Sequence, residues 1–142
     1  MNEFLPPVTL ILGGQRSGKS RLAETLIEDA AGGGLYLATA EARDGEMTER
    51  IATHRARRGP DWETIEEPLD ILGQIREHAA PGRPVLVDCV TLWLSNLMAA
   101  GRDAESEVET LARGLAGLAG PVVLVSNEVG LGVIPANALA RS

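Results

Sequence analysis

The sequence is poor in cysteine and in positive charge, and each shortage excludes a class of protein. The chain has one cysteine, Cys89, so an internal disulfide is excluded. Because Cys89 lies in the apolar run "VLVDCV", it is predicted to be a small buried core residue. The 13 basic residues are outnumbered by 20 acidic ones, which gives a net charge of -7. A net negative charge repels the phosphate backbone of a nucleic acid and so opposes binding to it. We therefore expect small-molecule partners, no nucleic acid, and a reducing compartment.

Long apolar segments are missing as well. No run approaches the roughly 18 apolar residues of a membrane-spanning helix. The N-terminal "MNEFLPP" has an acidic residue and two prolines where a secretory signal needs positive charge and an apolar stretch. We expect a cytoplasmic protein with no membrane segment. Because 44% of its 142 residues are hydrophobic, the chain can build the core of a single domain over residues 1–142.

What the chain does contain is an alternation of short aliphatic runs with segments of helical periodicity. Continuous Val, Leu and Ile runs are typical of parallel strands that are covered on both faces. The alternation predicts an α/β domain, and the glycines of "AGGGL" are expected to end the first helix with a left-handed cap. The predicted strands are Val8–Leu12, Leu35–Ala38, Val85–Val90 and Val122–Val125. The predicted helices are Ser20–Ala31, Glu46–Arg58, Leu69–Ala79, Thr91–Met98 and Asp103–Leu118.

The most specific motif is "GGQRSGKS", which matches the phosphate-binding loop (P-loop) pattern G-x-x-x-x-G-K-[ST] between a predicted strand and a predicted helix. Its glycines let successive backbone N–H groups face one anion, and the helix N-terminus adds partial positive charge. Lys19 is predicted to reach the β- and γ-phosphates and the Ser20 hydroxyl to bind Mg²⁺. The alternative is a glycine-rich turn with an exposed lysine. The predicted nucleotide-binding residues of the motif are Gly13, Gly14, Gln15, Arg16, Ser17, Gly18, Lys19 and Ser20.

A P-loop needs a second carboxylate on the metal side, and Asp88 at the end of "PVLVD" is the candidate. A charge that follows four apolar residues is costly unless something pairs with it, and hydrated Mg²⁺ is the usual partner in such sites. The alternative is that Asp88 caps the helix expected near Thr91. Because the P-loop is present, we favour the metal role.

A cluster of basic residues lies in the segment that is predicted to form the helix Glu46–Arg58. Five basic or potentially basic groups within nine residues of an acidic chain indicate an anion-binding site. His54 lies at the edge of the apolar stripe of this helix, and the arginines would keep its imidazole neutral and nucleophilic. From spacing alone, a packed surface histidine is the more common outcome. The five groups are Arg50, His54, Arg55, Arg57 and Arg58.

Four segments together resemble the bifunctional adenosylcobinamide kinase / adenosylcobinamide-phosphate guanylyltransferase family. They are "GGQRSGKS", "YLATAEARDGEMTERIATHRARR", "VDCVTLWLSNLM" and "VSNEVGLGVIPANALAR". The resemblance spans nearly the whole chain, and ordinary small kinases lack the last three segments. It implies a P-loop NTPase domain of the RecA-like type, with three layers and a mostly parallel central sheet. It also implies a homo-oligomer, a trimer with sites between subunits.

The resemblance implies two activities. One is the phosphorylation of adenosylcobinamide with ATP or GTP and Mg²⁺. The other is the transfer of GMP from GTP through a guanylylated His54, which gives adenosylcobinamide-GDP in the biosynthesis of adenosylcobalamin (vitamin B12). The guanine preference rests on the resemblance alone. Besides the catalytic His54 and Lys19, it implies nucleotide contacts at Thr39, Ala40, Glu41, Arg55, Ala56, Arg57, Arg58, Glu66 and Asp88.

The family continues after "VIPANALARS" through another helix and a final strand, whereas this chain ends at Ser142. We therefore expect this chain to lack that helix and strand, with the P-loop core upstream of them. Two other functions stay open. One is a small-metabolite P-loop kinase without a covalent intermediate, in which the basic helix only covers ATP. The other is a non-catalytic GTP-binding switch.

Overall fold

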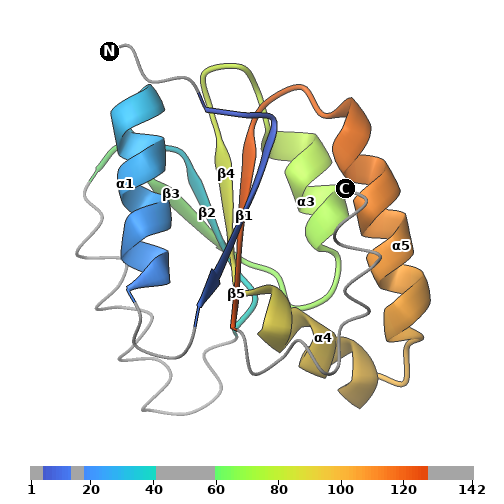
Figure 1. The fold of residues 1–142 in the computed structure, drawn as a ribbon. Helices are drawn as coiled ribbons and strands as arrows, with labels where there is room; N and C mark the ends of the chain where they lie inside the picture. Colours follow the sequence, from blue (N-terminus) through green and yellow to red (C-terminus); the bar gives the residue numbers. More distant parts are fainter. Residues whose placement is uncertain (1–4, 14–17, 41–59, 128–142) are drawn as a thin grey trace.

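A parallel sheet forms the middle layer of the protein (Figure 1). The structure is a computed structural model that describes residues 5–13, 18–40 and 60–127. In these ranges one sheet has the strand order β1-β5-β4-β2-β3, and every neighbouring pair is parallel. The strands are β1 (Val8–Gly13), β2 (Leu35–Ala38), β3 (Glu63–Glu66), β4 (Val85–Asp88) and β5 (Val122–Asn127).

Helices cover both faces of this sheet, as Figure 1 shows. On one face α1 packs Ala23 and Ile27 against Leu86 of β4 and Val123 of β5. On the other face α3, α4 and α5 enclose the larger core cluster. This arrangement of three layers confirms the predicted α/β class. The helices are α1 (Lys19–Ala31), α3 (Ile71–His78), α4 (Val90–Ala99) and α5 (Ala104–Gly114), and a 3-10 turn (Leu115–Gly117) follows α5.

The continuous apolar runs are explained by burial on both faces. Along β2, Leu35 and Leu37 belong to the core under α3, α4 and α5, whereas Tyr36 and Ala38 belong to the core under α1. Successive side chains of a strand point to opposite faces, so a strand covered on both sides has no position for a solvated polar residue. All four residues of β2 are buried.

The structure changes some predicted boundaries and adds one strand. The predicted strand Val85–Val90 ends at Asp88, because Cys89 already caps α4. The predicted helix Asp103–Leu118 is α-helical only to Gly114. Strand β3 was not predicted, and the predicted helix Glu46–Arg58 lies outside the described residues.

Glycine ends α1 as expected. Gly32 has a φ of 84°, in the left-handed region, and its N–H donates to the Glu28 carbonyl at 2.8 Å. A residue with a side chain rarely adopts this conformation, which explains why the chain has glycine there.

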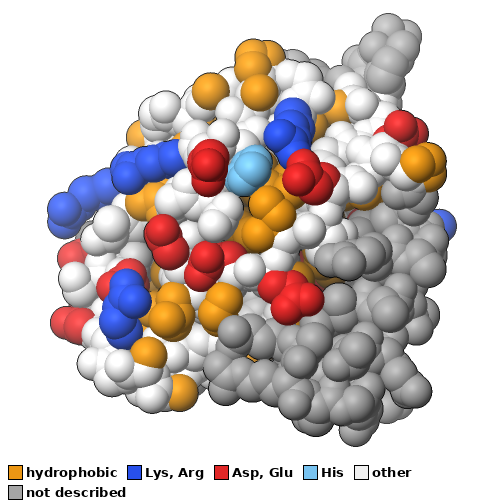
Figure 2. Space-filling view, turned by 180° about the vertical axis from the view of Figure 1, so that it is seen from behind, with side chains coloured by type: hydrophobic (Ala, Val, Ile, Leu, Met, Phe, Trp, Pro, Cys, Tyr) orange, Lys and Arg blue, Asp and Glu red, His pale blue; other side chains and the backbone are white. Residues whose placement is uncertain are grey.

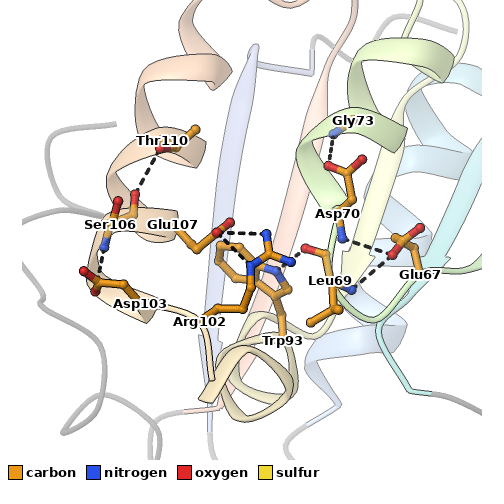
Figure 3. A network of polar contacts seen from close by, with 10 residues as sticks. All are labelled: Glu67, Leu69, Asp70, Gly73, Trp93, Arg102, Asp103, Ser106, Glu107 and Thr110. Carbon is orange, nitrogen blue, oxygen red and sulfur yellow. Dashed lines mark hydrogen bonds and ion pairs between the residues drawn. The ribbon is translucent and has the colours of Figure 1, made fainter. Parts of the chain in front are cut away.

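Polar contacts fix the layer formed by α3, α4 and α5 (Figure 3). Asp70 accepts a hydrogen bond from the Gly73 N–H at 3.0 Å and thereby caps α3. Asp103 caps α5 in the same way. Between these helices, the indole N–H of Trp93 donates to the Leu69 carbonyl at 2.8 Å. The start of α3 is thus tied to α4.

Charge is mixed on the face of the molecule that Figure 2 shows. Lys and Arg side chains are interspersed with Asp and Glu, and the described residues on this face form no continuous basic stripe. None of the helices within the described ranges has both the length and the apolar character needed to cross a membrane.

Candidate nucleotide-binding site

The predicted site residues gather where the strands end. In register, Gly13 of β1 pairs with Asn127 of β5, and Ala38 of β2 lies between Asp88 of β4 and Glu66 of β3. Because all strand pairs are parallel, these five residues share one edge of the sheet. Ligands of open α/β sheets bind in the crevice outside this carboxyl edge.

Helix α1 begins at the same edge. Its cap residue Gly18 has a φ of 81°, and no side chain caps the helix. The first turn has no acidic residue, so its backbone N–H groups and the positive end of the helix dipole are suited to an anion. Lys19 is the first helical residue and is half-buried. This geometry supports phosphate binding at the start of α1.

The hydroxyl of Ser20 joins α1 to the end of β4. Ser20 Oγ donates to Asp88 Oδ2 at 2.9 Å, although the two residues are 68 positions apart in the chain. Tyr36 of β2 donates its hydroxyl hydrogen to the same Asp88 oxygen. Asp88 therefore faces the start of α1, and this placement is compatible with the predicted metal role.

The alternative role of Asp88 is wrong. The residue that caps α4 is Cys89, whose Sγ accepts from the Leu92 N–H at 3.4 Å. This also corrects the prediction for Cys89, which is a half-buried cap and not a core residue. Burial raises the pKa of the Cys89 thiol above its usual value; the charge of Asp88 adds to this rise, and the charge of Lys19 opposes it.

Thr39 fixes the backbone next to Asp88. This fully buried residue accepts from the Cys89 N–H at 2.9 Å through Oγ1 and donates to the Cys89 carbonyl at 2.8 Å. In turn, Asn96 of α4 donates its amide to the carbonyls of Thr39, at 2.9 Å, and Pro68, at 3.1 Å. These bonds hold the chain after β2, β3 and β4 in one arrangement.

Magnesium bound with a nucleotide fits the donors that are present. Ser20 and Asp88 supply a hydroxyl and a carboxylate, and within the described ranges no hydrogen bond to Asp88 Oδ1 is found. Those ranges also contain no group of three or more His, Cys, Asp or Glu that could hold a metal ion alone. Mg²⁺ is usually bound by one or two carboxylates together with substrate phosphates. Ser20 and Asp88 would therefore hold it together with a nucleotide.

The structure brings together only part of the predicted site. The predicted residues found at the carboxyl edge are Gly13, Gly18, Lys19, Ser20, Thr39, Ala40, Glu66 and Asp88. The predicted residues that lie outside the described ranges are Gly14, Gln15, Arg16, Ser17, Glu41, His54, Arg55, Ala56, Arg57 and Arg58.

Two residues of the site were missed from the sequence. Tyr36 donates a hydrogen bond to Asp88, and Asn96 donates to the carbonyls of Thr39 and Pro68, which follow β2 and β3. Tyr36 is the only tyrosine of the chain and lies in an apolar strand, where its polar hydroxyl needs a partner. That was the available signal. Asn96, on a helix with predominantly apolar residues, offered a similar one.

A glycine-capped helix start opposite a strand-end carboxylate defines the protein as a P-loop nucleotide-binding domain. Sequence comparison then identifies the family. The family model described as "Cobinamide kinase / cobinamide phosphate guanyltransferase" (CobU) matches residues 9–142. The chain therefore belongs to this family.

Three named relatives are similar to this chain over most of its length. The Bifunctional adenosylcobalamin biosynthesis protein CobP of Pseudomonas aeruginosa is 52% identical over 134 residues, which cover 93% of this chain and 78% of the relative. Proteins named CobU from Escherichia coli and Salmonella typhimurium are 37% and 39% identical, over 93% of this chain and 81% of their own length. Among solved structures, an ATPase domain aligns with a TM-score of 0.48 at 12% identity, covering 84% of this chain and 56% of its own.

Proposed function

We propose that this chain phosphorylates adenosylcobinamide and then transfers GMP to the product, as a bifunctional enzyme of adenosylcobalamin biosynthesis. The observation that carries the proposal is the 2.9 Å hydrogen bond from Ser20 to Asp88 beside the start of α1, in a chain of the CobU family. Relatives that share up to 52% of its residues are named bifunctional adenosylcobalamin biosynthesis proteins. The resemblance further implies a homotrimer.

In the proposed kinase step, the phosphates of ATP or GTP lie at the N-terminus of α1. Lys19 would bind the outer phosphates, and Ser20 and Asp88 would hold Mg²⁺, which would neutralise charge on the phosphates. The terminal hydroxyl oxygen of the aminopropanol arm forms a bond to the γ-phosphorus. The bond from that phosphorus to the β–γ bridging oxygen breaks, the nucleoside diphosphate leaves, and the hydroxyl proton is released to water. The protein contributes positioning and charge in this step.

In the proposed second step, an imidazole nitrogen of His54 attacks the α-phosphorus of GTP. Pyrophosphate leaves, and a phosphorus–nitrogen bond joins GMP to the protein. A phosphate oxygen of the phosphorylated substrate then attacks the same phosphorus and releases His54. The basic sequence around His54 and the family membership support this role.

The test is to incubate the full chain with Mg²⁺ and GTP labelled on the α-phosphate, in the absence of corrinoid. We expect label on the protein from α-labelled GTP and none from γ-labelled GTP, because pyrophosphate departs with the outer phosphates. The label should be lost in mild acid, which protonates the imidazole leaving group, and should survive alkali.

The two histidines of the chain provide a matched pair of variants. His54→Ala should abolish the label, whereas His78→Ala, at the end of α3, should keep it. Label that persists on His54→Ala would contradict the assignment of the nucleophile. Phosphate transfer to the corrinoid without any labelled protein would support the simpler kinase, and GTP binding with neither product would support the switch.

A further inference from the structure

We propose that Tyr36 is a positioning residue for the carboxylate on the metal side: its hydroxyl fixes the rotation of Asp88 and keeps Oδ1 available for Mg²⁺. The inference rests on the proposed function, because it takes Asp88 as a metal ligand. The observation behind it is that Asp88 Oδ2 accepts hydrogen bonds from two hydroxyls, Tyr36 and Ser20, which come from different elements.

Tyr36 lies two residues before Ala38, the last residue of β2 at the carboxyl edge. Tyr36 pairs with Leu86, and Ala38 pairs with Asp88, so Tyr36 and Asp88 are diagonal neighbours on strands β2 and β4. Both side chains point to the face that α1 covers, as the contacts with Ser20 and the core cluster show. A tyrosine side chain is long enough to span such a diagonal, whereas an aliphatic one has no donor to offer.

The ring of Tyr36 is itself held in place. It is only 5% exposed, and Trp62 packs edge-on against it with ring centroids 6.5 Å apart and an interplanar angle of 73°. The indole N–H of Trp62 donates to Glu28 Oε2 of α1 at 3.0 Å. Because the ring is enclosed by the sheet, Trp62 and α1, its hydroxyl can occupy only a small region, which is the position of the Asp88 carboxylate.

The number of hydroxyl hydrogens available to Asp88 gives Tyr36 a role that Ser20 alone cannot have. Each hydroxyl has one hydrogen, and both are donated to Oδ2 of Asp88. The lone pairs of Ser20 and the Oδ1 atom of Asp88 then remain available to a cation. Without the tyrosine hydroxyl, the carboxylate is free to rotate and present either oxygen to Ser20. Loss of the hydroxyl should therefore weaken metal binding and leave phosphate binding by α1 and Lys19 intact.

The test uses Tyr36→Phe, which removes the hydroxyl and keeps the ring against Trp62. GTP binding is measured by calorimetric titration over a series of Mg²⁺ concentrations and in EDTA. We expect the Mg²⁺ concentration for half-maximal enhancement of GTP binding to rise about 10-fold or more, as when other groups that orient a metal ligand are removed. GTP affinity in EDTA should equal that of the wild type.

Thr9→Val is the matched control. It also deletes a buried hydroxyl from the sheet, and Thr9 Oγ1 has no hydrogen-bond partner in the described part of the chain. The Mg²⁺ midpoint of this variant should equal that of the wild type. Thermal unfolding in EDTA is recorded for each variant to verify that it is folded.

Asp88→Asn separates the inference from the function on which it rests. If Tyr36 acts through Asp88, Tyr36→Phe should add no further shift in the Asp88→Asn background. A full additional shift there overturns the positioning role. A wild-type midpoint in Tyr36→Phe, with a shifted one in Asp88→Asn, also overturns it while the metal role of Asp88 survives. No shift in Asp88→Asn would overturn both that metal role and the present inference.

Discussion

At the scale of the residue, the site depends on short polar side chains at the ends of apolar strands. Asp88 follows three buried residues of β4, and its charge is compensated by hydroxyls from Ser20 and Tyr36. Thr39 satisfies both backbone groups of Cys89 with a single hydroxyl. Such pairing is necessary, because a buried polar group without a partner costs about 1–3 kcal/mol. The same contacts fix the direction in which Asp88 points.

Lys19 should contribute to the binding of the triphosphate and not to the fold. We expect Lys19→Ala to weaken GTP binding about 10- to 100-fold, because a hydrogen bond to a charged group contributes about 1.5–3 kcal/mol. The measurement is a calorimetric titration with GTP in the presence of Mg²⁺. The thermal midpoint without nucleotide should stay close to that of the wild type.

Arg21→Ala is the control for this variant. Arg21 lies on α1 two residues from Lys19, its side chain is 60% exposed, and it approaches Glu24 at 3.7 Å. Residues two positions apart on a helix face different directions, so removal of this charge should leave GTP affinity nearly unchanged. Equal losses in both variants would mean that general positive charge, and not the P-loop lysine, binds the nucleotide.

At the scale of the element, the predictions that succeeded came from patterns that burial enforces. Strands β1, β2, β4 and β5 are aliphatic because layers cover both faces, and α1 follows a P-loop motif that requires a helix there. Strand β3 has the sequence "ETIE", with one aliphatic residue and a carboxylate at each end. It pairs only with β2 among the described strands, so it is not buried enough to show the apolar pattern.

The site residues were predictable where the P-loop motif determines the position of the backbone. Contacts between side chains of different strands were less predictable. Gly18, Lys19 and Ser20 follow from the loop pattern. Tyr36 and Asp88 are 52 positions apart in the chain, and their contact depends on the register of β2 and β4. Local sequence contains no information on that register. The same reason explains why the sequence predicts a core residue at Cys89: its capping bond depends on where β4 ends.

The start of α3 shows how one carboxylate can stabilise a helix. The Glu67 carboxylate faces Leu69 and Asp70, the two residues before this helix, in Figure 3. It accepts from the N–H groups of Leu69 at 3.1 Å and Asp70 at 3.0 Å, and from the side-chain amide of Gln74 at 3.3 Å. Burial by itself would raise the pKa of Glu67, but the hydrogen bonds from Asp70, Leu69 and Gln74 outweigh it and lower the pKa below its usual value.

This lowered pKa predicts a loss of stability in acid. The pKa of Glu67 is lower in the folded chain than in the unfolded chain, so at pH values between the two the unfolded chain binds the proton more readily. The stabilisation is therefore present above the ordinary glutamate pKa of about 4.3, and it is lost as the pH falls through the pKa of the folded state. Glu67→Gln should lack this part of the acid dependence and should lower the free energy of unfolding at neutral pH by about 1 kcal/mol, the net contribution of a typical hydrogen bond. Urea unfolding of both proteins over a pH series measures it.

Gln74→Ala is the matched variant for the same network. It removes the longest of the three hydrogen bonds, at 3.3 Å, and leaves the two backbone donors to Glu67 in place. Its acid dependence should therefore lie between those of the wild type and Glu67→Gln. Parallel stability curves for wild type and Glu67→Gln over the whole pH series would contradict the stabilising role of the charged carboxylate.

At the scale of the whole molecule, the proposed ligand would connect parts that the fold holds separately. The P-loop helix follows β1, Asp88 ends β4, and β5 lies between these two strands in the sheet. A nucleotide with Mg²⁺ at the carboxyl edge would contact both sides of this arrangement, and the unfolded chain has no such site. Binding should therefore stabilise the entire sheet and not one loop.

We expect GTP with Mg²⁺ to raise the thermal midpoint of the whole domain in a single cooperative transition. A ligand at a hundred times its dissociation constant stabilises the folded state by about 2.7 kcal/mol, which corresponds to roughly 10 °C for a chain of this length. Guanosine should give almost no shift, because the proposed site at the start of α1 would bind phosphate and not the base. Lys19→Ala should lose about half or more of the GTP shift at the same nucleotide concentration, whereas Arg21→Ala should keep it, and both are measured by scanning calorimetry. An equal shift with guanosine would mean that the base supplies the binding energy, and the assignment of the α1 N-terminus as the phosphate site would have to be abandoned.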